Sequence, residues 1–219
     1  MRKIILAFSI LFISLSGRTQ VYKPFWNEIQ AFKKADSINM PPPGAILFIG
    51  SSSFRKWTTI QQDFKGYNII NRGFGGSVFP DILGYVDDIV KPYHPAQVVI
   101  YCGDNDLAFS NSVTPKIVEQ RFIELFNAVR NIYPSTKILF VSIKPSPSRK
   151  KLLPQIEESN DLIRHFLNTQ KNTAYADVFH PMMNGASPVG ELFINDSLHM
   201  NEKGYAIWTR VIQPYLIKK

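Results

Sequence analysis

The chain has 219 residues, of which 45% are hydrophobic and 19% are charged. This balance is ordinary for a folded globular protein and argues against an intrinsically disordered chain. The length suits one domain with a sizeable core. The net charge is +8, but the positive residues are scattered, with no dense basic run interleaved with aromatic residues. We therefore expect no nucleic-acid partner, and we interpret the short run Arg149–Lys151 as solvated loop surface.

Residues 1–20 have the pattern of a secretory signal peptide. Arg2 and Lys3 form a positive start, Ile4–Leu15 is mostly apolar, and small residues follow. The apolar stretch is short for a membrane span, although an uncleaved anchor is the alternative. We predict a signal peptide over 1–20, a single domain over 21–219, and export to the periplasm or the extracellular space. No later segment is apolar over enough length to insert stably into a membrane after signal removal.

Cys102 is the single cysteine of the chain. A lone cysteine forms no internal disulfide, and its position in the apolar run 97–102 indicates a small buried side chain. The spacing of Cys and His residues supports no metal site, and we expect no cofactor.

Helical and apolar segments alternate along the chain. We predict a first helix over Phe25–Ile38, because Trp26, Ile29 and Phe32 recur at helical spacing. Short apolar runs predict strands at Ala45–Ile49, Tyr67–Ile70, Gln97–Tyr101, Lys137–Ile143 and Thr173–Val178. Longer helical patterns lie at Phe79–Val90, Pro115–Ile132, Leu152–Thr169 and Glu202–Ile217. Thr114 followed by Pro115 indicates the start of the second, and we expect Pro214 to kink or end the last.

Strict alternation of strand and helix predicts an α/β fold of three layers, a flavodoxin-like five-stranded parallel sheet between two layers of helices. Such sheets place their active sites just beyond the carboxyl ends of the strands. The residues that follow the predicted strands are therefore the first candidates for function.

Four polar segments stand at or near such positions. They are Gly50–Ser53, Asn71–Ser77, Cys102–Asp106 and Asn195–His199. Alone, each has a simpler interpretation: a serine helix cap, a glycine turn, a loop, or a pair of metal ligands. A nucleotide-binding flavodoxin-like protein would also alternate strands and helices, but the glycines match no phosphate-binding loop.

Together, in this order and spacing, the segments resemble the conserved blocks of the SGNH/GDSL hydrolases. Gly50–Ser53 resembles the block that names the family, with Ser51 where Asp is common. Gly103–Asp106 resembles the G-x-N-D block, and Asp196–His199 resembles the D-x-x-H block. Asn71–Gly76 resembles the second block, and the resemblance extends over about residues 45–210.

The resemblance implies a serine esterase with the SGNH hydrolase fold. Ser52 would be the nucleophile, His199 the general base, and Asp196 the carboxylate that orients the histidine ring. The oxyanion hole would consist of the Ser52 N–H, the Gly76 N–H and the Asn105 side chain. The three adjacent serines leave the register open by one place, and Gly75 is an alternative to Gly76.

Predictions about the substrate rest on weaker sequence signals than those for the catalytic residues. We predict that Arg72, Phe74 and Asp106 contact it, and that other nearby aromatic residues belong mainly to the core. We interpret the remaining histidines as structural or solvent-facing, with His180 as the first candidate for an exception near the site. The expected partner is a small-molecule or glycan ester, with a short acyl group such as acetyl. Alternatives are a lysophospholipase or thioesterase, and a non-catalytic carbohydrate-binding protein on the same fold.

Overall fold

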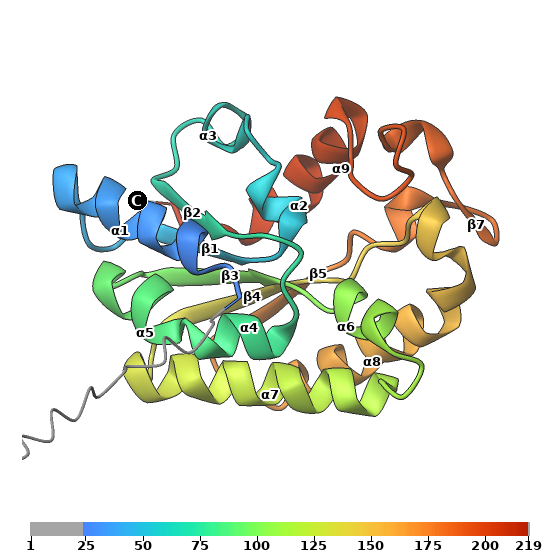
Figure 1. The fold of residues 1–219 in the computed structure, drawn as a ribbon, viewed down its shortest axis with the longest axis horizontal. Coiled ribbons are helices and arrows are strands. Elements are labelled where there is room, and N and C mark those ends of the chain that lie inside the picture. The colour runs from blue at the N-terminus through green and yellow to red at the C-terminus, as the bar shows by residue number, and fades with distance from the viewer. Residues whose placement is uncertain (1–23, 219) are drawn as a thin grey trace, which may run out of the picture.

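The computed structural model describes residues 24–218. The signal peptide predicted at 1–20 lies outside the described residues. The central element is a parallel sheet with the strand order β2-β1-β3-β4-β5 (Figure 1). Its strands are β1 (Ile46–Gly50), β2 (Ile69–Gly73), β3 (Gln97–Tyr101), β4 (Lys137–Val141) and β5 (Thr173–Ala176). The structure thus confirms the predicted α/β class and five-stranded sheet.

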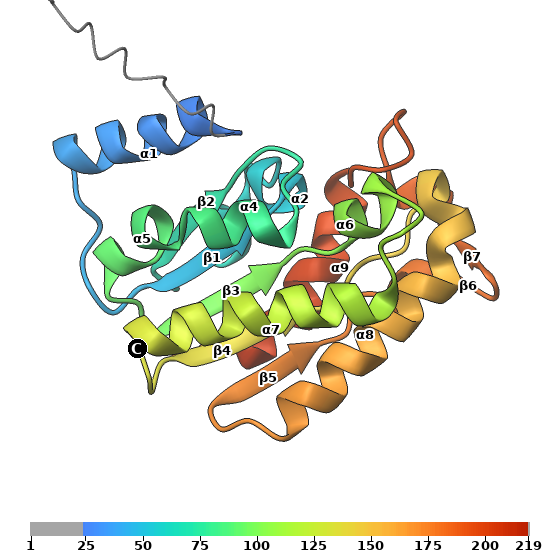
Figure 2. The ribbon, with the colours of Figure 1, turned by 60° about the horizontal axis from the view of Figure 1, so that its bottom comes forward.

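Helices cover both faces of the sheet (Figures 1 and 2). One face carries α4 (Phe79–Gly84), α7 (Pro115–Ile132) and α8 (Leu153–Asn168), with α5 (Val86–Ile89) and α1 (Trp26–Ile38) at its margin. The opposite face carries α2 (Ser52–Arg55), α3 (Ile60–Asp63) and α9 (Glu202–Ile212). The short helix α6 (Asp104–Phe109) follows β3, and a small hairpin pairs β6 (Met183–Asn184) with β7 (Ser187–Pro188).

Two apolar clusters form the core, one on each face of the sheet. Successive side chains of β1 alternate between them: Leu47 and Ile49 join one cluster, whereas Ile46 and Phe48 join the other. This follows from the pleat of a strand, which points successive side chains to opposite faces. Burial of both faces explains why the strands read as continuous apolar runs.

Two predicted helices are interrupted. The helix predicted over 79–90 is divided into α4 and α5 at Tyr85, which leaves helical geometry; its ring packs on Phe74 and its hydroxyl donates to the Pro24 carbonyl at 2.6 Å. The last helix ends at Ile212, and Pro214 lies in a following 3-10 turn, which confirms the expected effect of the proline, because proline cannot continue the α-helical hydrogen bonding. Within residues 24–218, no helix combines the length and apolar character needed to cross a bilayer.

Candidate active site

The polar segments that follow β1, β2 and β3 meet the loop before α9 at one edge of the sheet. This is the edge formed by the carboxyl ends of the parallel strands, as the sequence predicts. Ser52 is the first residue of α2, separated from the end of β1 by Ser51 alone. Its position is therefore set by β1, an interior strand of the sheet.

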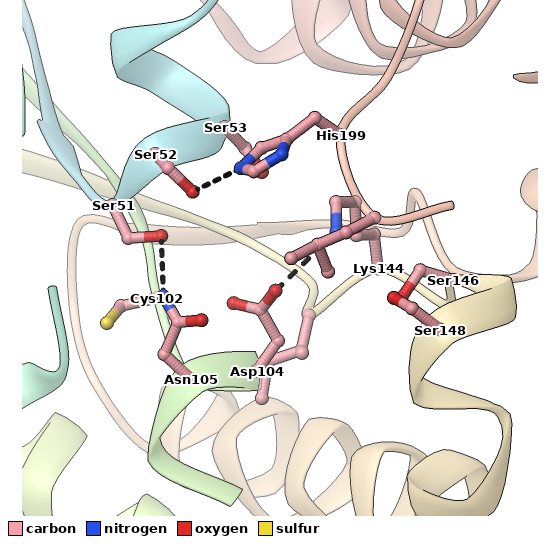
Figure 3. Close-up of polar contacts among 12 residues, drawn as sticks. Ser51, Ser52, Ser53, Cys102, Asp104, Asn105, Lys144, Ser146, Ser148 and His199 are labelled. Carbon is pink, nitrogen blue, oxygen red and sulfur yellow. Dashed lines mark hydrogen bonds and ion pairs between the residues drawn. The ribbon is translucent and has the colours of Figure 1, made fainter. Parts of the chain in front are cut away.

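Ser52, His199 and Asp196 form a hydrogen-bonded series (Figure 3). The Ser52 Oγ lies 2.9 Å from the His199 Nε2, and the His199 Nδ1 lies 2.6 Å from the Asp196 Oδ2. The structure thus brings together residues that are 147 positions apart in the chain. In this geometry the ring can accept the serine proton at Nε2 while the carboxylate holds the Nδ1 proton.

The Asp196 carboxylate is held by its own loop. Its Oδ1 accepts the backbone N–H groups of Leu198 at 2.9 Å and of His199 at 2.8 Å. Burial opposes the charged form of Asp196, but the hydrogen bonds from His199 and Leu198 outweigh it and lower the pKa of Asp196 to about 2. The carboxylate therefore stays ionised and fixed beside the ring.

Contacts between α2 and α9 hold the serine against the histidine. The Tyr205 hydroxyl of α9 donates to the carbonyl of Ser53 at 2.9 Å, and the Tyr205 ring stacks on Trp57 with centroids 5.0 Å apart. Asn201 caps α9 by accepting the N–H groups of Lys203 and Gly204. The Tyr205–Ser53 hydrogen bond is buried, so the two chain segments are preorganised for the short Ser52–His199 distance.

Hydrogen-bond donors converge beside Ser52. The Asn105 side-chain amide donates to the Ser77 carbonyl at 3.3 Å and lies 3.4 Å from the Ser51 hydroxyl (Figure 3). An alanine Cβ built at Gly76 would have the Asn105 Nδ2 as its nearest atom, at 3.7 Å. Gly76 and Asn105 thus border the same small space, as expected of an oxyanion hole.

The structure distinguishes the two glycines that the sequence left open. Gly75 is buried and donates its N–H to the Glu28 carboxylate at 3.1 Å. Gly76 is exposed, and among residues 24–218 no hydrogen bond uses its N–H. The Gly76 N–H is therefore available to a ligand, whereas the Gly75 N–H is occupied.

The three predicted substrate-binding side chains are not brought to the site. Arg72 is directed to α1, where its guanidinium pairs with Asp36 at 2.5 Å. Phe74 is fully buried against Phe25. Asp106 is also fully buried and pairs with Arg121 at 2.8 Å. Each side chain is thus engaged within the protein, and that it contacts substrate stays a prediction.

Other predictions from single residues are borne out. The aromatic side chains near the strand ends are core residues, each at most 1% exposed: Phe54, Trp57, Phe74, Phe79 and Tyr101. Cys102 is buried, and burial raises the pKa of its thiol well above the usual value. His180 pairs through Nδ1 with Asp177 at 2.7 Å, repeating the Asp-x-x-His geometry without a serine partner in the described part of the chain.

The contacts of three polar residues near the site are not predicted from the sequence. Ser51 is buried and contacts Asn105 through its hydroxyl. Lys144 and Asp104 form a buried ion pair, with 3.5 Å between Nζ and Oδ2, next to His199 and Asn105 (Figure 3). The position of Lys144 just after an apolar strand is one sequence signal for this pair, because a lysine that is buried there requires a carboxylate partner. The sequence does not show which carboxylate that is.

The fold and this site define a class, ester-bond hydrolases with a three-layer fold of helices around a parallel sheet. The chain belongs to the GDSL-like lipase/acylhydrolase family, whose model matches residues 46–207. The match confirms the resemblance that the four polar segments carry. No match is found among curated proteins.

Solved structures share the fold at low sequence identity. A putative platelet activating factor from Streptococcus pneumonia superposes with a TM-score of 0.76 at 20% identity, covering 87% of this chain and 92% of that one. A putative acylhydrolase from Bacteroides fragilis gives a TM-score of 0.75 at 20% identity, with 87% and 96% covered. A carbohydrate esterase of family 3 from Talaromyces cellulolyticus gives 0.64 at 17% identity, with 78% and 95% covered.

Proposed function

We propose that the protein is a serine esterase that removes short acyl groups, such as acetyl, from carbohydrates or small esters. The observation that carries this proposal is the 2.9 Å contact between the Ser52 Oγ and the His199 Nε2, with Asp196 behind the ring. A binding protein has no need of a nucleophile aligned with a base. The same alignment is what acyl transfer through a serine requires.

The reaction proceeds in two halves. The Ser52 oxygen attacks the ester carbonyl while His199 takes the serine proton, and the resulting oxyanion accepts the N–H of Gly76, the N–H of Ser52 and the amide of Asn105. His199 then gives its proton to the departing alcohol, which leaves an acyl group on Ser52. Water, deprotonated by His199, attacks this acyl-enzyme and releases the carboxylic acid and free Ser52.

The surroundings of Ser52 favour a short acyl group. The aromatic side chains nearest to it in the chain, Phe54 and Trp57, are packed into the core and offer no exposed apolar wall. A long acyl chain would need such a wall to leave water favourably. The structural likeness to a carbohydrate esterase agrees with a sugar ester as substrate.

We also propose that the protein is exported. The support is the sequence of residues 1–20, with its positive start and apolar stretch. Mass spectrometry of the protein purified from the producing cell tests this: a mature N-terminus near residue 20 is expected, and a protein that retains Met1 and stays in the cytoplasm would contradict it.

Covalent labelling tests the nucleophile. A fluorophosphonate probe should modify wild-type protein at Ser52, and Ser52→Ala should abolish both labelling and hydrolysis of 4-nitrophenyl acetate. Ser53→Ala is the matched control, because Ser53 is the next residue of the same helix but is buried. Ser53→Ala should retain labelling, and full activity in Ser52→Ala would overturn the assignment.

A matched pair of histidine variants tests the base. His199 and His180 have the same Asp-x-x-His geometry, yet only His199 contacts Ser52. His199→Ala should therefore lose about 10³-fold or more in kcat, whereas His180→Ala should keep it. Acetylated sugars, longer 4-nitrophenyl esters, lysophospholipids and acyl thioesters, compared as substrates, then decide between an acetyl esterase and the other acylhydrolases. Preference for a long acyl chain would contradict the short-chain proposal.

A further inference from the structure

Arg149 is half-buried, and one nitrogen of its guanidinium, Nε, lacks a hydrogen-bond partner among the described residues. It lies in the 3-10 turn Pro147–Leu152, where its Nε is buried without a hydrogen-bond partner, and no ion pair to it is found among residues 24–218. Other partly buried arginines are paired: Arg72 with Asp36, and Arg121 with Asp106. A buried charged donor without a partner is unfavourable, and such groups in folded proteins generally indicate a missing ligand or water.

The turn that carries Arg149 is bonded to the catalytic loop. The backbone N–H of Ser148 donates to the carbonyl of Ser197 at 3.0 Å, and Ser197 lies between Asp196 and His199 in the chain. The neighbouring cation, Lys144, is buried and paired with Asp104. Arg149 therefore supplies a positive charge beside the active site that no carboxylate of the described chain neutralises.

The geometry of the reaction places the alcohol part of the ester on this side. His199 must deliver its proton from Nε2 to the alcohol oxygen, so that oxygen has to lie within hydrogen-bond reach of the ring. The acyl oxygen points the other way, toward Gly76 and Asn105, which follow β2 and β3. The alcohol part thus extends over the loop to which the turn of Arg149 is bonded.

We propose that Arg149 binds a negatively charged group on the alcohol part of the substrate, so that the substrate is the ester of an alcohol carrying a carboxylate or a phosphate. This inference rests on the esterase function proposed above. A guanidinium is suited to the role because its planar N–H groups match the oxygens of either anion. Arg149 is then a residue that determines specificity, whereas Lys150 and Lys151 are exposed, as the sequence predicts.

Three acetyl esters of para-substituted phenols test the proposal: 4-acetoxybenzoate, 4-acetoxyphenyl phosphate and the neutral 4-acetoxybenzamide. kcat and KM are measured from acetate release for wild type, Arg149→Gln and Arg149→Lys. Lys150→Gln is the matched control, because it removes the same charge from the next, exposed residue. Thermal unfolding of each variant reports whether the fold is kept.

In Arg149→Gln we expect kcat/KM for an anionic ester to fall about tenfold or more, mainly through KM, since a charge-assisted hydrogen bond is lost. The neutral ester should lose less than about threefold, and Arg149→Lys should recover part of the loss. Lys150→Gln should match wild type on all three esters. Whichever anionic ester depends more on Arg149 identifies the charged group.

An equal loss on charged and neutral esters in Arg149→Gln would overturn the proposal, because it would indicate a structural role. The same selective loss in Lys150→Gln would also overturn it, by indicating a general charge effect. If wild type cleaves the neutral ester and Arg149 has no selective effect, the esterase function stands and this inference fails. If wild type cleaves none of the esters and Ser52 is not labelled by fluorophosphonate, the esterase function itself fails.

Discussion

Replacing Gly76 with alanine should separate catalysis from stability. Gly76 is exposed, and an added Cβ meets nothing closer than the Asn105 Nδ2 at 3.7 Å, which is an ordinary contact. The folded protein therefore has room for the methyl group. Because alanine restricts the unfolded chain more than glycine does, we expect the free energy of unfolding to stay equal or to rise by up to about 1 kcal/mol.

The kcat of Gly76→Ala should fall, because the added Cβ lies close to the Asn105 amide. An oxyanion that accepts a hydrogen bond from the Asn105 Nδ2 would sit about 2.9 Å from that nitrogen, in the space that the new Cβ enters. The oxyanion would then lose its contact with the Gly76 N–H or with Asn105. Loss of one such donor typically lowers kcat by about 10²–10³-fold, or about 2.7–4 kcal/mol.

The assay is kcat for 4-nitrophenyl acetate together with the urea unfolding midpoint. Gly75→Ala is the contrasting variant: Gly75 has φ +42°, and a Cβ there would lie 2.1 Å from the Phe25 ring, so this variant should unfold more easily. Gly76→Ala with more than about a tenth of wild-type kcat would refute the placement of the oxyanion beside Gly76.

Three further predictions follow from the charged groups around the site. Lys144→Met should lower the free energy of unfolding by about 3–5 kcal/mol, because it leaves the buried Asp104 carboxylate unpaired. In urea titrations, the double variant Lys144→Met with Asp104→Asn should recover most of that loss. Purely additive losses in the double variant would contradict the pairing. Burial raises the pKa of Asp106 from 3.8 to about 6, so the folded protein retains a proton that the unfolded chain has released between these values. Stability should therefore fall as pH rises through this window, by at most about 1.4 kcal/mol per pH unit, and Asp106→Asn should flatten the slope of unfolding free energy against pH. Asp196→Asn should reduce kcat by up to about 10⁴-fold with little change in KM, because the His199 ring loses its orienting carboxylate, and an unchanged kcat would exclude that role.

The order of the elements could be predicted from local sequence. Apolar runs such as 97–101 became strands with the predicted bounds, and Thr114 followed by Pro115 marked the start of α7. These successes have a local cause, since a strand buried on both faces must be apolar and a helix start needs a cap. The spaced polar segments likewise carried the family resemblance, because the chain order of the blocks is a property of the sequence.

Local sequence also failed where a distant partner decided the outcome. The helix predicted over 79–90 divides at Tyr85, whose hydroxyl reaches back to Pro24. Arg72 lies near the carboxyl end of β2, at the correct edge of the sheet, yet its guanidinium pairs with Asp36 of α1. No local sequence pattern predicts these two contacts, because each depends on how α1 and the residues before it pack onto the sheet.

Residue types and their spacing along the chain determined the sheet, its helices and the candidate nucleophile and base. Only the tertiary structure decided that Gly76 rather than Gly75 offers a free N–H and that Asp104 takes Lys144 as its partner. It also decided that the Arg149 Nε is buried without a hydrogen bond to any residue that the structure describes. The physical reason is that hydrogen bonds and ion pairs are satisfied by whichever groups the fold brings within about 3 Å. The proximity of two such groups arises from tertiary packing, and no short stretch of sequence predicts it.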